Sequence, residues 1–436
     1  MEFTVLDKIL PTSERYRVFA DGKELKVISD VEYDYVYIYT DDIVSVKVEI
    51  ADDIKDIALR PTRRAKKFTI ENGSVNFLMS RADYYCLEVN GDLKRPLLLF
   101  CEEKIEKQIY DGQNVIYFKP HTYYKTGIIT LESNTVVFLD EGAVIEGKIH
   151  AEGAKNIRIL GNGTIMSQSP EYGSSPNIDL RKCEKIEVNG ITIVGCNNWN
   201  FRMWRSKGIL VENLKILAHK VYSDGLDIVS CEDVVVRHIF VKNEDDCVCI
   251  KSSGTEKSNY EGQDVRNVLV EDCVLWSGPR GNSLEIGYET NNSTIENLLF
   301  RNVDVIHRQT QESKFHRSII SIHNAGNAVV RNITYENIYA EETDENFIML
   351  AHMNQPSWGI SGGVIENIRL RNVTLAGGEL RPTTLRSAPY NAKKPCVLKN
   401  ITFENLKIHG KEIKSLEDAL EKAFSVDSGV ENLKFI

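Results

Sequence analysis

Three aspartates near the middle of the 436-residue chain have the residue type and spacing of an acid–base site. Asp224 stands in the segment SDGLD, and Asp245 and Asp246 follow 21 residues later in NEDDC. A single aspartate in such a segment usually belongs to a turn. Three carboxylates on one face repel one another, so their convergence is costly unless a function uses it. Such a group can keep one acid protonated while another stays ionised, which glycoside hydrolysis requires.

A repeated strand pattern predicts the scaffold that positions these aspartates. A polar residue is followed by alternating apolar residues and then by Asn or Asp, as in NITYENI. Nine copies, 23 to 35 residues apart, begin at Asn156, Lys185, Gly208, Asp233, Asn267, Asn297, Asn332, Asn367 and Asn400. A period of two indicates strands, and a short strand buries its apolar side chains only when copies of it stack. The chain is therefore predicted to be all-β, with a right-handed parallel β-helix over residues 106–436.

Aligning the strand after each copy predicts which side chains stack from coil to coil. The first column should contain Arg202, Asp227, Cys249, Glu285 and Ser321, and the second Trp204, Val229, Lys251, Gly287 and His323. The third should contain Trp199, Asp224, Asp246, Asn282 and Ser318. Because adjacent coils lie about 4.8 Å apart, Asp224 and Asp246 should be neighbours. Asp245 should lie beside them, and its carboxyl group can reach a position apart from that pair, since successive strand residues face opposite sides.

Further polar and aromatic residues on this surface are candidate contacts for a sugar. They are Lys251, Asn282, Glu285, Glu289, His323, Arg317, Asp227, Arg202, Trp199 and Trp204. The cationic side chains can donate to hydroxyl groups, the carboxylates can accept from them, and the indole rings can stack on a sugar ring. The alternative is that these are paired surface residues, or core residues in the case of the tryptophans.

Two other parts of the helix carry a predicted structural role. Asn302, Asn337, Asn372 and Asn405 recur at the same place in successive copies and are predicted to stack as an internal amide ladder. Near the C-terminus, EIKSLEDALEKAF predicts a helix from about Ile413 to Phe424 that packs on the last coil.

Residues 1–105 lack the repeat and are predicted to form a small β-sandwich domain. The segment DVEYDYVYIYT places Tyr33, Tyr35, Tyr37 and Tyr39 on one face of a strand. A turn at residues 41–42 and the following VSVKVEI predict a hairpin. The tyrosine face is suited to binding sugar, but packing against the β-helix or the other sheet is the favoured interpretation.

Composition limits the partners and the cofactors. The net charge of −10 argues against nucleic acid, which needs a basic surface. No run of 18 apolar residues exists, so no membrane span is expected. The nine scattered cysteines are expected to be free thiols, and the C-x-C pair Cys247 and Cys249 lacks a metal-site spacing, so no metal or other cofactor is expected. The first residues lack a secretory pattern, which predicts a cytoplasmic protein, or a secreted one if a leader was removed. An oligomer is compatible with all of these features.

The segment VYSDGLDIVSCEDVVVRHIFVKNEDDCVCIKS resembles the signature of glycoside hydrolase family 28, the polygalacturonases. That family has N-T-D-G-I-D, then D-D-C and an ending similar to I-K-S, and the resemblance covers about residues 110–410. It implies an inverting hydrolase in which Asp245 is the general acid, while Asp224 and Asp246 hold and activate the water. The dextranase-like family 49 shares the β-helix, a similar aspartate trio and a β-rich N-terminal domain, and the chain combines features of both families.

The chain departs from the family 28 pattern where a uronate would bind. Asn282 stands where the histidine of the G-H-G motif is expected, and Ser321, Ile322 and His323 replace the R-I-K motif that is associated with gripping a carboxylate. The segment between Asp246 and Asn282 is also longer than the family pattern leads us to expect. These departures predict a carbohydrate substrate other than plain polygalacturonate.

Two alternatives to hydrolysis remain open at this point. A polysaccharide lyase on the same fold would eliminate rather than hydrolyse, with Ca²⁺ held by the oxygen ligands of the trio. A β-helix that binds glycans without catalysis is the other alternative. The motif match at the aspartates favours the hydrolase over both.

Overall fold

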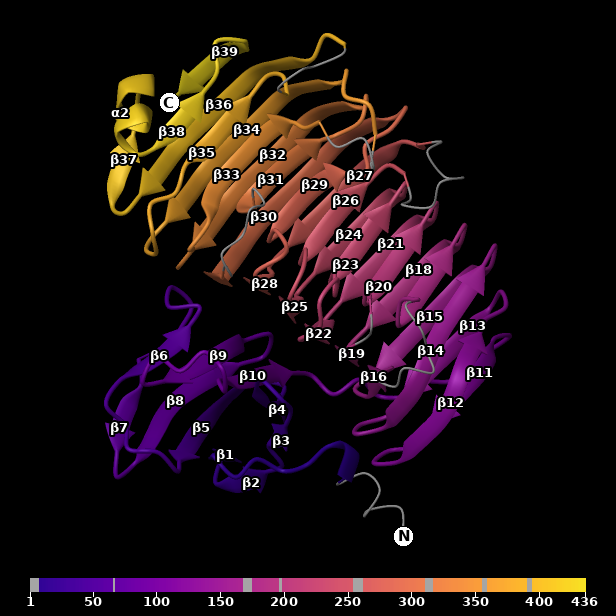
Figure 1. Ribbon diagram of the computed structural model, residues 1–436. Coiled ribbons are helices and arrows are strands. Elements are labelled where there is room, and N and C mark those ends of the chain that lie inside the picture. Colours follow the sequence, from indigo (N-terminus) through magenta and orange to yellow (C-terminus); the bar gives the residue numbers. More distant parts are fainter. Residues whose placement is uncertain are drawn as a thin grey trace.

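The computed structural model describes residues 8–65, 67–167, 175–195, 198–253, 262–309, 317–354, 359–389 and 394–436. Strands between residues 16 and 102 form a β-sandwich, and strands between residues 114 and 435 wind into an elongated right-handed parallel β-helix (Figure 1). The sandwich lies along one flank of the helix. The predicted fold class is confirmed, and residue 105, the predicted domain boundary, lies between β10 (Leu97–Glu102) and β11 (Asn114–Phe118).

The coils of the helix contribute strands to three parallel series. The first series contains β13 (Thr135–Leu139), β15 (Lys155–Gly161), β18 (Glu184–Asn189), β21 (Lys207–Glu212), β24 (Glu232–Arg237) and β27 (Val265–Glu271). The second contains β16 (Thr164–Met166), β19 (Thr192–Val194), β22 (Lys215–Leu217), β25 (Phe240–Asn243) and β28 (Val274–Ser277). The third contains β17 (Ile178–Arg181), β20 (Phe201–Trp204), β23 (Leu226–Val229), β26 (Val248–Lys251), β29 (Leu284–Tyr288), β31 (Ser318–Asn324), β33 (Asn346–His352), β35 (Thr383–Arg386) and β38 (Phe424–Val426).

Longer strands join these series at both ends of the helix. At the N-terminal end, β12 (Tyr123–Thr130) pairs with β14 (Val144–Glu152), which pairs with strands of the second and third series. In the C-terminal half, the first and second series merge into β30 (Thr294–Arg308), β32 (Val329–Ala340), β34 (Val364–Leu375) and β36 (Val397–Ile408). Alternate residues of all series point inward and form one apolar core that runs from Phe118 to Phe424. Stacking of the repeated strands thus buries apolar side chains that a single short strand would leave exposed.

Two ladders of asparagine side chains run along corners within the long strands β30, β32, β34 and β36. In one, the amide nitrogens of Asn337, Asn372 and Asn405 each donate to the amide oxygen one coil earlier, beginning at Asn302, over 2.8–2.9 Å. The second ladder contains Asn297, Asn332, Asn367, Asn400 and Asn432. All of these residues have a positive φ of 52–59°, a conformation that asparagine tolerates better than most residues. The predicted stacking of Asn302, Asn337, Asn372 and Asn405 is confirmed, but the ladder is not internal, because its members lie at exposed or half-exposed corners while apolar residues fill the interior.

Two five-stranded sheets make up the sandwich. One contains β2 (Lys23–Leu25), β1 (Tyr16–Ala20), β5 (Ile43–Ile50), β8 (Ser74–Ser80) and β7 (Thr69–Glu71) in that order. The other contains β3 (Ile28–Ser29), β4 (Asp34–Tyr39), β10, β9 (Tyr84–Val89) and β6 (Ile57–Arg60). The predicted hairpin at residues 41–42 is wrong, since β4 and β5 lie in different sheets and the turn crosses between them. The alternation of apolar residues is the same for a hairpin within one sheet and for a crossing between two sheets, because Val36 and Val46 point into the same core in both.

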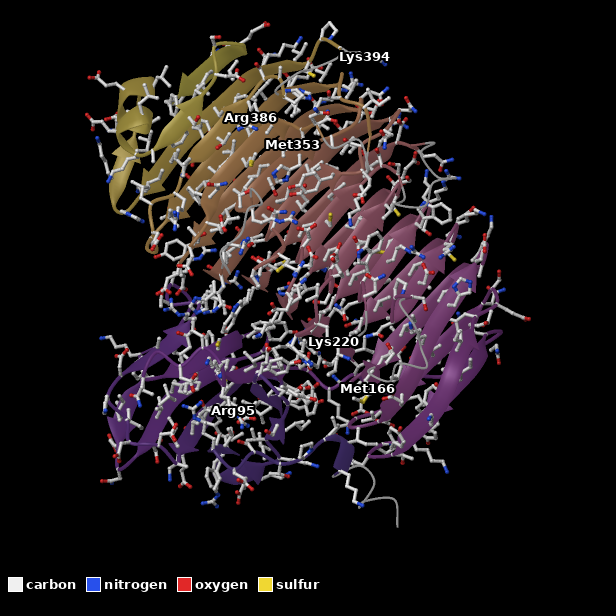
Figure 2. All side chains as sticks on the ribbon, in the orientation of Figure 1. Arg95, Met166, Lys220, Met353, Arg386 and Lys394 are labelled. Carbon is white, nitrogen blue, oxygen red and sulfur yellow. The ribbon has the colours of Figure 1, made fainter. Side chains whose placement is uncertain are left out.

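The outer face of the second sheet packs on the second strand series of the helix. Tyr33 and Tyr35 are fully buried there in a cluster with Phe240 and Trp276. Met166, labelled in Figure 2, belongs to the same cluster. The favoured interpretation of the tyrosine face, packing against the helix, therefore holds for these two tyrosines.

Buried ion pairs reinforce this interface. The ammonium of Lys215 donates to both carboxylate oxygens of Glu102 at 2.7 Å, and both side chains are almost fully buried. Arg60 of the sandwich pairs with Glu341 of the helix at 2.6 Å. Buried charges are tolerated only when they are paired in this way. The sandwich and the helix each supply charges that neutralise buried charges of the other.

The C-terminal segment closes the end of the helix. The helix α2 (Leu416–Glu421) is shorter than the predicted one, and Ser415 caps it by accepting a hydrogen bond from the Asp418 backbone. Ala419 reaches the apolar core below the last coil. The helix contacts β37 (Lys411–Ile413) and β38, and β39 (Val430–Phe435) follows as the last strand. Among the described residues, no helix has the length and apolar character needed to cross a membrane.

Candidate active site

The three aspartates lie at the entrances to two neighbouring strands of the third series. Asp224 precedes β23, and Asp245 and Asp246 precede β26. The backbone N–H of Gly225 donates to the Asp246 carbonyl at 2.7 Å, and that of Cys247 donates to the Asn282 carbonyl at 2.9 Å. These bonds place Asp224, Asp246 and Asn282 at equivalent positions on three successive coils, as the repeat predicts.

The strand pairing also confirms the predicted first column. Arg202 pairs with Asp227, Asp227 with Cys249, Cys249 with Glu285, and Glu285 with Ser321. Each step is one coil, so side chains that are 22 to 36 residues apart in sequence become direct neighbours. The repeat alone was sufficient to derive this register.

Two residues that the sequence did not single out shape the Asp245–Asp246 turn. A Cβ atom on Gly281 would lie 1.7 Å from the carbonyl carbon of Asp245, so only glycine lets this segment approach so closely. The Asn243 amide donates to the carbonyls of Ser223 at 2.9 Å and Asp246 at 2.8 Å, which ties the two acidic turns together. Because Gly and Asn are common in ordinary turns, the sequence alone does not signal these roles.

The three carboxyl groups converge in a nearly buried position. Asp224, Asp245 and Asp246 are 4%, 9% and 6% exposed, and one oxygen of each lies within 4.8 Å of the others. Asp245 thus lies beside the other two, as expected, but its carboxyl group does not stand apart from theirs, because the turn before β26 is not extended strand and does not alternate its side chains. Three oxygens so arranged are also a possible ligand set for a hard cation such as Ca²⁺.

Burial and mutual repulsion make the three carboxyl groups unequal. Burial raises the pKa of Asp245 well above its usual range, and the charges of Asp224 and Asp246 raise it further, while Arg317 and Lys251 act in the opposite direction. Burial also raises the pKa of Asp224, but there Lys251 opposes it directly. Asp245 is thus the carboxyl group of the trio that is best placed to keep a proton.

Asp246 accepts two hydrogen bonds from a single neighbour, Asn282. Both the backbone N–H and the side-chain amide of Asn282 donate to its Oδ1, at 2.7 and 2.8 Å. The amide oxygen of Asn282 in turn accepts from the backbone N–H of Ser318 at 2.8 Å, which fixes the orientation of the amide. Asn282, predicted as a sugar contact, is therefore seen to position Asp246.

Lys251 balances the negative charge on the other side of the trio. Its ammonium donates to Asp224 at 2.9 Å and to Asp227 at 2.8 Å, and it lies 3.9 Å from the ring centre of Trp199. Burial disfavours its charge, yet Asp224 and Asp227 together raise the pKa of Lys251 well above its usual range. Asp227 is fully buried, and burial raises its pKa strongly as well. Lys251 and Asp227 thus support the trio.

A second buried cluster lies on the C-terminal side of the trio. Glu285 and His323 are both fully buried, and His323 Nδ1 lies 2.9 Å from the Glu285 carboxylate, which also accepts from Ser321. The imidazole ring stacks flat on Tyr288, with ring centres 4.5 Å apart and planes inclined by 2°. Arg317 covers the same tyrosine ring at 5.6 Å. The structure brings these predicted residues together, whereas Tyr288 was not predicted.

The remaining residues that were predicted to contact sugar lie outside the trio and the Glu285–His323 cluster. Arg202 donates to the Asp179 carboxylate at 2.8 and 2.9 Å and lies 5.7 Å from the ring of Trp199. Trp204 ends the same strand, β20, and lies beneath Arg205, at 5.0 Å. Glu289 is 5% exposed, and burial raises its pKa. Trp199 thus contacts both Arg202 and Lys251, which bonds to Asp224. The ring of Trp204 instead contacts Arg181, Lys182 and Arg205. The segment 254–261, part of the long stretch between Asp246 and Asn282, lies outside the described residues.

The geometry agrees with a family assignment made from the whole sequence. The family model described as glycosyl hydrolases family 28 matches residues 109–424, which include the complete trio and both clusters beside it. The chain belongs to this family. Its β-helix, from before β11 to β38, is the part that the family defines.

Curated relatives of this family 28 member act on different sugars. Isopullulanase from Aspergillus niger is 23% identical over 305 residues, which cover 61% of this chain and 50% of the relative. Exopolygalacturonase A from the same organism is 24% identical over 221 residues, covering 44% and 48%. The chain spans about half the length of these relatives.

Solved structures resemble the chain in fold. Dex49A from Penicillium minioluteum superposes with a TM-score of 0.60 at 12% identity and covers 98% of this chain and 95% of its own. The family 28 exopolygalacturonase of Yersinia enterocolitica gives a TM-score of 0.53 at 14% identity, covering 97% and 94%. Both likenesses extend over the N-terminal sandwich as well as the helix.

Proposed function

We propose that this protein is a glycoside hydrolase that cleaves an O-glycosidic bond of an oligo- or polysaccharide. The observation that carries the proposal is that the three aspartates have different environments. Asp245 keeps its proton because of burial and like charges, whereas Asp246 accepts two hydrogen bonds and Asp224 faces an ammonium. Asp245 then donates a proton to the leaving oxygen, and Asp224 and Asp246 activate the attacking water.

Inversion of the anomeric centre is part of this proposal. The nearest oxygens of the trio lie within 4.8 Å of one another, which is closer than the about 6.5–9.5 Å of a typical inverting carboxylate pair. The inference of inversion therefore rests on the family resemblance, and on two carboxylates being available for one water. Proton NMR of the first product, recorded before mutarotation, tests it. A product that keeps the configuration of the cleaved bond would mean that one aspartate is a nucleophile.

A neutral glycan is the proposed substrate. Lys251 is already bonded to two carboxylates, and His323, which stands in place of the lysine of R-I-K, is engaged by Glu285. A uronate carboxylate would therefore find the Lys251 ammonium and the His323 Nδ1 already engaged by carboxylates of the protein. The test is a panel of defined oligosaccharides, with gluco-, galacto- and galacturono-configured members assayed for reducing-sugar release. Faster hydrolysis of polygalacturonate than of every neutral glycan would refute the substrate proposal.

A Ca²⁺-dependent lyase is the second candidate, because the trio offers three converging oxygens. Two observations weigh against it. The Lys251 ammonium already neutralises Asp224 at 2.9 Å, and Ca²⁺ generally takes six to eight oxygen ligands. Formation of an unsaturated product that depends on added Ca²⁺ would favour the lyase over the hydrolase.

A further inference from the structure

A cavity of about 470 Å³ lies where the sandwich meets the first coils of the helix. From the sandwich it is lined by Tyr37, Tyr39 and Thr40, at the end of β4, and from the helix by Asn162 and Thr164, next to β16. In Figure 1 the sandwich strands β3 and β4 face this end of the helix. Cavities of about 300–1,000 Å³ at domain interfaces are typical small-molecule sites. None of the three aspartates lines this cavity.

The tyrosine face of β4 divides into two halves at this cavity. Tyr33 and Tyr35 are fully buried against the helix, whereas Tyr37 and Tyr39 remain half-buried and line the cavity. The rings of Tyr37 and Tyr39 are parallel within 9°, with centres 6.3 Å apart. The Tyr37 hydroxyl donates to Thr192 at 2.7 Å, which locks its ring in place. Rigid amphipathic rings of this kind suit the apolar face of a sugar.

Asn162 adds a hydrogen-bond donor that the protein itself leaves unused. Its amide oxygen accepts from the backbone N–H of Ile105 at 2.7 Å, which determines which end of the amide is oxygen and which is nitrogen. The amide nitrogen is buried and has no hydrogen-bond partner among the described residues, although Asn162 is only 5% exposed. A buried donor without a partner is costly. A ligand oxygen in the cavity would remove that cost.

The charged groups around the cavity have both signs. Lys104 and Glu141 pair with each other at 3.1 Å, and Lys23, Lys26 and Asp21 stand at the exposed rim. Because carboxylates stand among the lysines, the lining is not a dedicated anion site, and its charged and hydroxyl groups can accept from and donate to sugar hydroxyls.

We propose that this cavity is a second carbohydrate site, which binds one or two residues of a neutral saccharide independently of the aspartate trio. The sugar ring stacks on Tyr39, and one of its oxygens accepts from the Asn162 amide. The inference goes beyond the proposed catalytic function and does not require it.

The test measures saccharide binding to the full chain with Asp245→Asn, so that substrate is not consumed. Saturation-transfer NMR screens gluco-, galacto-, manno- and xylo-trisaccharides, with trigalacturonate for comparison, and calorimetry then measures the affinity of each binder. Tyr39→Ala should weaken binding at the second site by about tenfold or more, whereas Tyr39→Phe, which keeps the ring, should change it by less than about threefold. Asn162→Asp keeps the acceptor for Ile105 and replaces the donor by a second acceptor oxygen, and it should weaken binding by about tenfold.

The controls separate this site from the catalytic one. In a chain that retains Asp245, the cavity variants should keep the melting temperature and the kcat/KM for a short chromogenic glycoside of the parent. If the trio is not catalytic, the kcat/KM comparison gives no result, but the binding experiment remains valid. The proposal is overturned if no neutral trisaccharide shows a binding component that Tyr39→Ala removes, or if trigalacturonate binds this site more tightly than every neutral one.

Discussion

Replacing Lys251 by methionine removes the one ammonium that bonds to both Asp224 and Asp227. The Lys251 side chain is 4% exposed and those of its two partners are 5% and 0% exposed, so water cannot take over its role. Removing one partner of a buried ion pair costs about 3–5 kcal/mol, because the remaining charge is left uncompensated. We expect Lys251→Met to lower the free energy of unfolding by about this amount at pH 8.

The penalty should depend on pH in a defined direction. Burial already raises the folded-state pKa of Asp224 and Asp227 above that of the unfolded chain, and loss of the ammonium raises it further. A carboxyl group with a raised folded-state pKa contributes stability at low pH that is lost as pH rises from about 4 through the folded-state value. The destabilisation by Lys251→Met should therefore be smaller at pH 5 than at pH 8.

Urea unfolding of the wild type and the variant at both pH values measures this effect. Lys207→Met is the matched control, because Lys207 pairs with Glu232 at 3.1 Å on the surface and is 58% exposed, where such a pair contributes about 0–1 kcal/mol. Adding Asp227→Asn to Lys251→Met should restore part of the lost stability. An equal penalty at pH 5 and pH 8 would refute the idea that Lys251 balances the carboxylates.

Three other predictions concern turnover. Asp245→Asn should leave the fold intact and lower kcat by about 10²–10⁴-fold. The control Asp111→Asn, at an exposed position, should leave kcat unchanged. If Asp245→Asn retains more than about a tenth of the turnover, the assignment of Asp245 as the acid is contradicted. Arg317→Gln removes a charge that lowers the pKa of Asp245, so the alkaline limb of the kcat profile should move to higher pH, and an unchanged or lowered limb would argue against Asp245 as the proton donor. Exhaustive chelation should leave hydrolysis intact, and loss of activity that Ca²⁺ restores would instead support the lyase.

Much of the fold and part of the site followed from periodicity. The alternation and the spacing of the repeat were enough to place Asp227 opposite Cys249 and Asp224 opposite Asp246, because a parallel stack converts sequence period directly into spatial register. What periodicity could not supply was the conformation of the turns. Asp245 turns toward its neighbours, because its segment is a tight turn under Gly281 rather than extended strand.

Contacts between the two domains were equally beyond prediction. Lys215 and Glu102 are 113 residues apart, and His307 meets Glu88 across 219 residues, with no pattern in either segment to connect them. The crossing of the chain from β4 to β5 was missed for a related reason, since a turn between two amphipathic strands has the same composition in a hairpin and in a sandwich. Pairing partners of this kind are decided by tertiary packing.

The buried interface between sandwich and helix restricts how this architecture can change during evolution. An exchange of the N-terminal domain with that of a relative would leave Phe240 and Trp276 facing a foreign surface and the Lys215 ammonium without its carboxylate. Recombination at the boundary would thus be selected against unless both sides changed together. Loops at the turns of individual coils carry no such constraint, so diversity in substrate range is expected to arise there, while the two domains are inherited as one unit.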